Sequence, residues 1–253
     1  MTALLQLDGV GKRFGGLEAN RDVSFTVEEG QVVGLIGPNG AGKTTLFNCI
    51  SGFFPPTSGR ITFAGQDITG WSADRVVHLG MARTFQVVRT LPEMTVLDNV
   101  MVGAFARTSR ASVARARSLE LLEFTGLAPR SDVLGMNLTI ADKKRLEVTR
   151  ALATEPRLLM LDEAMAGLNP YERARAVELI RAIRARGVTV LMVEHVMEVL
   201  MPISDHVIVL DSGHPIAEGP PREIVRNPAV IAAYLGDKYR PAPDPTPPPA
   251  EEA

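Results

Sequence analysis

The feature that most constrains the fold is the segment from Gly37 to Thr44, whose sequence Gly-Pro-Asn-Gly-Ala-Gly-Lys-Thr fits the pattern G-x-x-x-x-G-K-[ST]. An apolar run precedes this segment and a helical pattern follows it, which is the context that the pattern requires. In such a loop the glycines let backbone N–H groups surround phosphates, Lys43 places a positive charge on them, and Thr44 can bind Mg²⁺. A chance glycine-rich turn would not bring all the fixed positions together. The predicted triphosphate site consists of Gly37, Pro38, Asn39, Gly40, Ala41, Gly42, Lys43, Thr44 and Thr45.

Short apolar runs alternate with amphipathic segments along much of the chain. The runs are long enough for strands and continuous enough to be buried on both faces, and they cover 31–36, 158–161, 188–193 and 206–210. Residues 171–186 have a helical pattern with charged residues on one face and an apolar face that we assign to Ala174, Val177, Ile180 and Ile183. Strands that alternate with helices predict an α/β fold with a mainly parallel sheet.

Composition and charge exclude several classes of protein. Lys and Arg number 27 against 29 Asp and Glu, so the net charge is −2, and we expect no general binding to nucleic acid. Cys49 is the single cysteine, which excludes an intrachain disulfide and fits a reducing compartment. The N-terminal residues carry no basic segment, and no apolar run approaches the roughly 20 residues that span a bilayer, so we expect neither a signal peptide nor a membrane span. If the protein works at a membrane, another chain holds it there.

Two carboxylates end the second apolar run, at Asp162 and Glu163. In α/β proteins, ligands bind at the carboxyl ends of the strands, so these residues are expected beside the phosphate loop. There Asp162 would hold Mg²⁺, and Glu163 would orient or deprotonate an attacking water. Taken alone, a strand that ends in Asp-Glu is often just the start of a helix; the phosphate loop favours the functional interpretation.

Two regions interrupt the alternation of strands and helices. The stretch from about 96 to 150 has helical patterns and no convincing strand, so we predict a helical insertion, with boundaries of about 90–152 in a domain that covers 4–240. The segment 241–253 contains six of the chain's 18 prolines and is expected to be a disordered tail.

Further motifs, in order over residues 4–236, match the nucleotide-binding subunits of ATP-binding cassette (ABC) transporters. The resemblance implies a P-loop NTPase core with a helical subdomain insertion and a small antiparallel β subdomain. It also implies that Phe14 stacks on adenine, although a plain core phenylalanine is the alternative. Gln86, in Arg-Thr-Phe-Gln, matches the glutamine that contacts Mg²⁺ or water and senses the transmembrane partner. His195 matches the histidine that contacts the γ-phosphate, and 166–169 match the loop that crosses the dimer interface.

The chain most resembles the branched-chain amino acid importers, and within them the first of two ATPase subunits. Three stretches carry this resemblance, namely 80–100, 166–170 and 203–236. It implies an ATP-hydrolysing subunit on the cytoplasmic face of the inner membrane, with membrane-spanning permease subunits, a second ATPase subunit and, indirectly, a periplasmic solute-binding protein. The alternatives are the ATPase of an exporter of lipid or lipopolysaccharide, and a soluble ABC ATPase without a transport role. The sequence leaves open whether the chain pairs with itself or with a paralogue.

The family signature, Leu-Ser-Gly-Gly-Gln or Leu-Ser-Tyr-Gly-Gln, is altered at 138–142 to Leu-Thr-Ile-Ala-Asp. In the family this segment faces the ATP bound by the partner, so Thr139 and Ala141 are candidate nucleotide-binding residues that serve the partner's site. Thr139 keeps a hydroxyl, whereas Ala141 adds a Cβ where glycine allows close approach. Asp142 adds a negative charge near a polyanion and is also a favourable N-cap residue, and the basic residues at 143–145 could offset its charge. A divergent working signature and a degenerate one both remain open.

Overall fold

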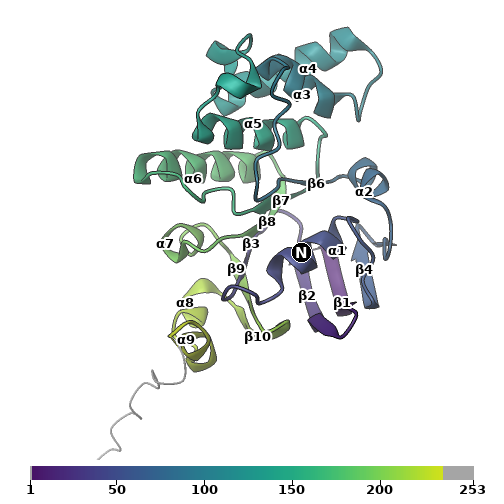
Figure 1. Cartoon of the computed structure of the whole chain (residues 1–253), viewed down its shortest axis with the longest axis vertical. Helices are drawn as coiled ribbons and strands as arrows, with labels where there is room; N and C mark the ends of the chain where they lie inside the picture. Colours follow the sequence, from purple (N-terminus) through teal and green to yellow (C-terminus); the bar gives the residue numbers. More distant parts are fainter. Residues whose placement is uncertain (1, 236–253) are drawn as a thin grey trace, which may run out of the picture.

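The computed structural model describes residues 2–235, and a six-stranded sheet forms its centre (Figure 1). The strand order is β10-β9-β3-β8-β7-β6; the edge strand β10 is antiparallel to β9, and the other neighbours are parallel. Every residue of β3, β7 and β8 is buried, which explains their continuous apolar sequences and confirms the predicted α/β fold. The strands are β3 (Val32–Ile36), β6 (Met81–Arg83), β7 (Leu158–Asp162), β8 (Thr189–Val193), β9 (His206–Asp211) and β10 (His214–Gly219).

A second, antiparallel sheet has the order β2-β1-β4-β5 and is the small β subdomain that the family resemblance implies. Its first two strands are long, and their buried positions alternate in part with exposed ones, as expected where one face covers a core. The strands are β1 (Ala3–Phe14), β2 (Leu17–Glu28), β4 (Ser58–Phe63) and β5 (Gln66–Asp67).

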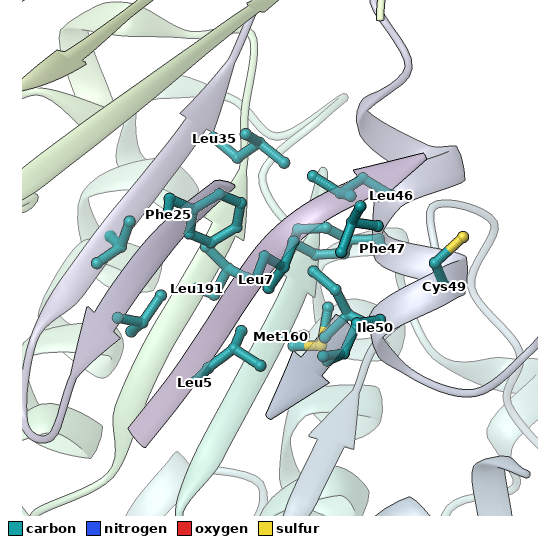
Figure 2. Packing of buried hydrophobic residues seen from close by; sticks show 14 of the residues in the cluster. Leu5, Leu7, Phe25, Leu35, Leu46, Phe47, Cys49, Ile50, Met160 and Leu191 are labelled. Carbon is teal, nitrogen blue, oxygen red and sulfur yellow. The ribbon is translucent and has the colours of Figure 1, made fainter. Parts of the chain in front are cut away.

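Helix α1 (Lys43–Ile50) lies between the two sheets, and Figure 2 shows its apolar side chains among those of both. Leu46, Phe47 and Ile50 are at most 1% exposed. Burying each such side chain contributes roughly 1.5–3 kcal/mol. The loop that precedes α1 is therefore attached to a helix that is firmly anchored in the core.

The chain between 96 and 152 forms helices at the end of the molecule farthest from α9 (Figure 1). They pack around their own buried cluster, which includes Val100, Leu122 and Leu146. The boundaries of about 90–152 for a helical subdomain, within a domain that covers 4–240, remain a prediction. The helices are α3 (Val96–Ala104), α4 (Ala111–Thr125), the 3-10 turns η1 (Ala128–Arg130) and η2 (Gly135–Asn137), and α5 (Ile140–Leu152).

Helix α6 (Pro170–Ala185) confirms the predicted helix, although its apolar face differs from the assigned one. It begins where Asn169 and Glu172 form a capping box. Ile180 and Ile183 are buried, but Ala174 is exposed, because a spacing of three residues rotates away from the core in a helix of 3.6 residues per turn. The remaining helices are α2 (Ala73–Leu79), α7 (Met197–Leu200), α8 (Pro221–Ile224) and α9 (Pro228–Leu235).

Within residues 2–235, no helix is both long enough and apolar enough to cross a membrane. The predicted tail at 241–253 lies outside the described residues.

Candidate nucleotide-binding site

The glycines of the phosphate loop are required by its geometry. A Cβ on Gly37 would lie 2.0 Å from the carbonyl oxygen of Leu210, and one on Gly42 would lie 2.4 Å from that of Ala19. Gly42 is the N-cap of α1 and has a φ of 92°, in the left-handed region that favours glycine. Helix α1 has no side-chain cap and no acidic residue in its first turn. Its N-terminal N–H groups are thus available to an anion.

Lys43 begins α1, and its side chain folds back over the loop. Its Nζ donates hydrogen bonds to the carbonyl oxygens of Gly37 at 2.7 Å and Pro38 at 2.9 Å. Burial lowers the pKa of Lys43, and the nearby Glu163 and Asp162 oppose this effect. An ammonium group has three donors, so one remains for a phosphate oxygen.

Asp162 ends β7 and is 1% exposed. Its Oδ2 accepts a hydrogen bond from Arg83 Nη2 at 2.8 Å, and its backbone N–H donates to the hydroxyl of Thr84. Burial raises the pKa of Asp162, and the bond from Arg83 opposes this rise. Its Oδ1 is buried and has no hydrogen-bond partner. A buried carboxylate oxygen without a partner is costly unless a ligand satisfies it.

The structure brings Glu163, Gln86 and His195 together. Glu163 Oε2 accepts a hydrogen bond from Gln86 Nε2 at 2.9 Å, and Glu163 Oε1 lies 2.6 Å from His195 Nε2. The backbone of Glu163 has a φ of 50°, which is uncommon for a residue other than glycine. Lys144 supports this conformation, since its Nζ donates to the Glu163 carbonyl at 2.8 Å. A carboxylate has about four acceptor positions, so Glu163 can still accept a proton from water.

These residues line a hollow of about 570 Å³ beside the phosphate loop. Of the candidate site residues, the hollow is lined by Asn39, Gly40, Ala41, Gly42, Lys43, Thr44, Thr45, Gln86, Glu163 and His195. Leu17, Glu18, Ala19 and Ser212 complete the wall. Gly37, Pro38 and Asp162 lie outside this lining, and the first two act through the carbonyls that hold Lys43.

Phe14 is 46% exposed at the end of β1 and does not line the hollow. Its ring packs edge-on against Phe54 at 5.4 Å, and Lys12 Nζ lies 5.1 Å from the ring centre. Exposure at this level does not fit a plain core phenylalanine. The assignment of Phe14 to adenine stays a prediction, whereas Leu17 is an apolar side chain that does line the hollow.

Thr139 and Ala141 lie at the start of α5, and neither lines this hollow. The expectation that Asp142 is an N-cap is wrong, because Thr139 holds that position and Asp142 is the third residue of the helix. The Thr139 hydroxyl accepts the N–H of Asp142 at 3.2 Å and donates to Asp142 Oδ2 at 3.0 Å. Arg130 and Arg145 pair with the same carboxylate at 3.3 and 3.6 Å.

The donor set near Asp162 suits Mg²⁺ only in combination with a phosphate. Within residues 2–235 no group of three His, Cys, Asp or Glu side chains could hold a metal ion. The candidate ligands Thr44, Gln86 and Asp162 supply neutral oxygens and one carboxylate. Mg²⁺ prefers such ligands and usually completes its octahedron with water and substrate phosphates.

Three residues near the site have contacts that the sequence interpretation did not assign. Arg83 contacts Asp162, Lys144 contacts the backbone of Glu163, and Glu194 accepts the N–H of Met165 at 2.8 Å. Burial raises the pKa of Glu194 to about 7. The sequence does contain one indication that residues 83 and 194 belong to the site, because each is a charged residue at the end of an apolar strand or directly after one.

Comparisons with known proteins agree with this geometry. A family model described as "ABC transporter" matches residues 20–166, and one described as "Branched-chain amino acid ATP-binding cassette transporter" matches 214–240. The high-affinity branched-chain amino acid transport ATP-binding protein BraF of Pseudomonas aeruginosa is 43% identical over 253 residues, covering 92% of this chain and 98% of BraF. The corresponding protein LivG of Escherichia coli is 42% identical over 250 residues, with the same shares covered.

Solved structures agree as well. The crystal structure of a nucleotide-free ATP-binding cassette from an ABC transporter superposes with a TM-score of 0.86 and 31% identity, covering 93% of this chain and all of that one. The chain therefore belongs to the ABC transporter family, in the group of branched-chain amino acid transport ATP-binding proteins.

Proposed function

We propose that this chain is the ATP-hydrolysing subunit that powers an importer of branched-chain or other hydrophobic amino acids. The observation that carries the proposal is the arrangement of Gln86 and His195 on the two oxygens of Glu163, beside the phosphate loop. The relatives BraF and LivG, named as branched-chain amino acid transport ATP-binding proteins, support the identity of the solute. The permease subunits would hold the chain at the cytoplasmic face of the inner membrane.

Each residue has a role in this chemistry. The N–H groups at the start of α1 and the Lys43 ammonium bind the phosphates, and Asp162, Thr44 and Gln86 are the candidates to hold Mg²⁺. When bound, Mg²⁺ would neutralise charge that develops on the phosphate oxygens. Glu163 accepts the proton of the attacking water, while His195 and Gln86 fix the orientation of its carboxylate.

A second ATPase subunit is part of the proposal. Thr139 and Ala141 do not reach the chain's own hollow, so they can act on a nucleotide only if another subunit brings one to them. A head-to-tail dimer does this, because each phosphate loop then faces the other chain's α5. The internal bonds of Thr139 and Asp142 favour a pair with unequal sites, in which this chain supplies the active glutamate and a poor signature.

Reconstitution of the chain with its permease subunits, second ATPase subunit and solute-binding protein in proteoliposomes tests the proposal. We expect binding protein loaded with leucine, isoleucine or valine to stimulate ATP hydrolysis and to drive accumulation of labelled amino acid, and Glu163→Gln to abolish both. Export of lipid or lipopolysaccharide without amino acid uptake would replace the import function. ATP hydrolysis by a chain that binds no permease would instead support a soluble role.

A further inference from the structure

The arginine at the end of β6 has an unusual environment. The Arg83 side chain is 7% exposed and forms an ion pair with Asp162, which is 1% exposed. Buried ion pairs add little net stability, because removing both charges from water costs about as much as their attraction returns. A guanidinium group at this position therefore needs an explanation other than stability.

Arg83 connects three elements of the site. One nitrogen, Nη1, donates to Asn48 Oδ1 at 2.6 Å and to Ser51 Oγ at 3.0 Å, while Nη2 donates to Asp162. Asn48 belongs to α1 and Ser51 is its C-cap, so the helix that follows the phosphate loop is joined to the carboxylate at the end of β7. The rings of Phe47 and Phe85, 5.6 and 5.3 Å from the guanidinium carbon, restrict its movement.

The hydrogen bond to Oδ2 determines which part of Asp162 can bind a ligand. With Oδ2 occupied, rotation of the carboxylate is restricted, and Oδ1 is the oxygen that lacks a partner. Gln86, three residues after Arg83, donates to the neighbouring carboxylate of Glu163. The segment 83–86 thus contacts both acidic side chains.

We infer that Arg83 is a positioning residue that orients Asp162 for Mg²⁺ and links this carboxylate to α1 and to the segment that carries Gln86. The inference rests on the proposed nucleotide and Mg²⁺ site. Arg83 would thus place the metal ligand Asp162 without contacting the nucleotide itself.

The test is equilibrium binding of a fluorescent ATP analogue, N-methylanthraniloyl-ATP, to the full-length chain at increasing Mg²⁺ concentrations and in EDTA. Arg83→Met should raise the Mg²⁺ concentration for half-maximal binding about tenfold, the weight of one charge-assisted hydrogen bond, and should leave binding in EDTA unchanged. Arg83→Lys keeps the charge, so its Mg²⁺ concentration for half-maximal binding should lie between those of the wild type and Arg83→Met. Asn48→Ala removes one partner of Arg83 and should cause a smaller shift in the same direction.

Two comparisons make the result decisive. Arg60→Met removes an exposed arginine that pairs with Asp67 at 3.4 Å, and should change nothing. Asp162→Asn should abolish the Mg²⁺ dependence; if it does not, the proposed metal site is wrong. If Asp162→Asn abolishes it while Arg83→Met responds to Mg²⁺ like the wild type, the role of Arg83 is refuted. Thermal unfolding shows whether Arg83→Met folds. If it does not fold, the role of Arg83 is refuted when Arg83→Lys and Asn48→Ala both show the Mg²⁺ dependence of the wild type.

Discussion

Two helix N-termini, those of α1 and α5, are expected to face phosphates in this protein, and they are built differently. At α1 the N-cap is Gly42, no side chain caps the helix, and no acidic residue occupies the first turn. At α5, Thr139 caps the helix and Asp142 stands in its first turn. The single hydroxyl proton of Thr139 is donated to Asp142, whose carboxylate also pairs with Arg130 and Arg145.

A helix N-terminus is expected to bind an anion best where its N–H groups have no internal acceptor. The start of α1 meets this condition. At the start of α5, the N–H of Asp142 already has an internal acceptor in the Thr139 hydroxyl, and the buried Asp142 carboxylate pairs with Arg130 and Arg145. We therefore predict that one chain combines a well-formed phosphate site with a signature that serves the partner's ATP less well.

The largest effect is expected from a substitution that disturbs the N-terminus of α1. Gly42→Ala introduces a Cβ that meets the Ala19 carbonyl and the Asn20 side chain at 2.4 Å. We expect ATP affinity to fall about 100-fold, the equivalent of roughly 3 kcal/mol of strain and loop displacement. Fluorescent ATP titration measures this. Gly65→Ala is the matched control, because Gly65 has a φ of 77° with no atom within 4 Å of the added Cβ, and should leave affinity unchanged. Equal losses in both variants would contradict the account.

The second test of the difference between the two helices changes the N-terminus of α5. The double substitution Ala141→Gly, Asp142→Gln removes the Cβ and the charge at α5. In the assembled transporter we expect total ATP turnover to rise. The rate of hydrolysis at the partner's site should increase about tenfold, the effect of removing one partly screened negative charge that lies near a polyanion. Unchanged turnover would mean that Leu138–Asp142 already works as a variant signature.

The predicted contact between Phe14 and adenine is a further feature of the nucleotide site at α1. Phe14→Ala should weaken ATP binding by about 1 kcal/mol, the scale of an aromatic stacking contact. Phe53→Ala, which removes another exposed ring close to Phe54, should have no effect. A loss of thermal stability with unchanged affinity would assign Phe14 to packing against Phe54, and Leu17→Ala would then test the other wall of the hollow.

A separate prediction concerns the stability of the fold and involves Glu194, which directly follows β8 and is buried. Its ordinary pKa is near 4.5 and its pKa in the folded chain is about 7. Because folding disfavours the charged form, Glu194 lowers the free energy of unfolding as the pH rises from about 4.5 to about 7. Glu194→Gln should therefore stabilise the protein at pH 8 by roughly 3 kcal/mol relative to wild type, and not at pH 4.

Thermal unfolding at the two pH values measures the difference. Glu178→Gln is the control, since the Glu178 side chain is 70% exposed and pairs with Arg181 on the surface. If the Tm difference between Glu194→Gln and wild type does not depend on pH, the buried charge of Glu194 has no effect on stability.

The sequence was most informative where function depends on local chemistry. The phosphate loop, the strand that ends at Asp162 and the continuous apolar strands were predictable because each pattern reports a neighbouring contact or a burial state. Gln86 and His195 followed only from family resemblance, since they meet Glu163 across 77 and 32 residues of chain.

Long-range partners account for the rest. The contact of Arg83 with Asp162 spans 79 residues, and nothing local to either residue specifies it. At α5, the sequence showed a hydroxyl and a carboxylate three residues apart, but not which of them caps the helix. The apolar face of α6 was misassigned at Ala174 because three-residue spacing approximates a helical face only over a short distance.

The most direct measurement substitutes the proposed catalytic glutamate of each ATPase subunit separately in the reconstituted transporter and compares steady-state ATP turnover. We predict that Glu163→Gln lowers turnover by at least about 100-fold, as expected for loss of a general base, and traps ATP in a closed dimer. The same change in the partner subunit should cost far less, because its ATP faces the altered signature of this chain. Equal losses in the two subunits, or full activity from a homodimer of this chain, would contradict the account.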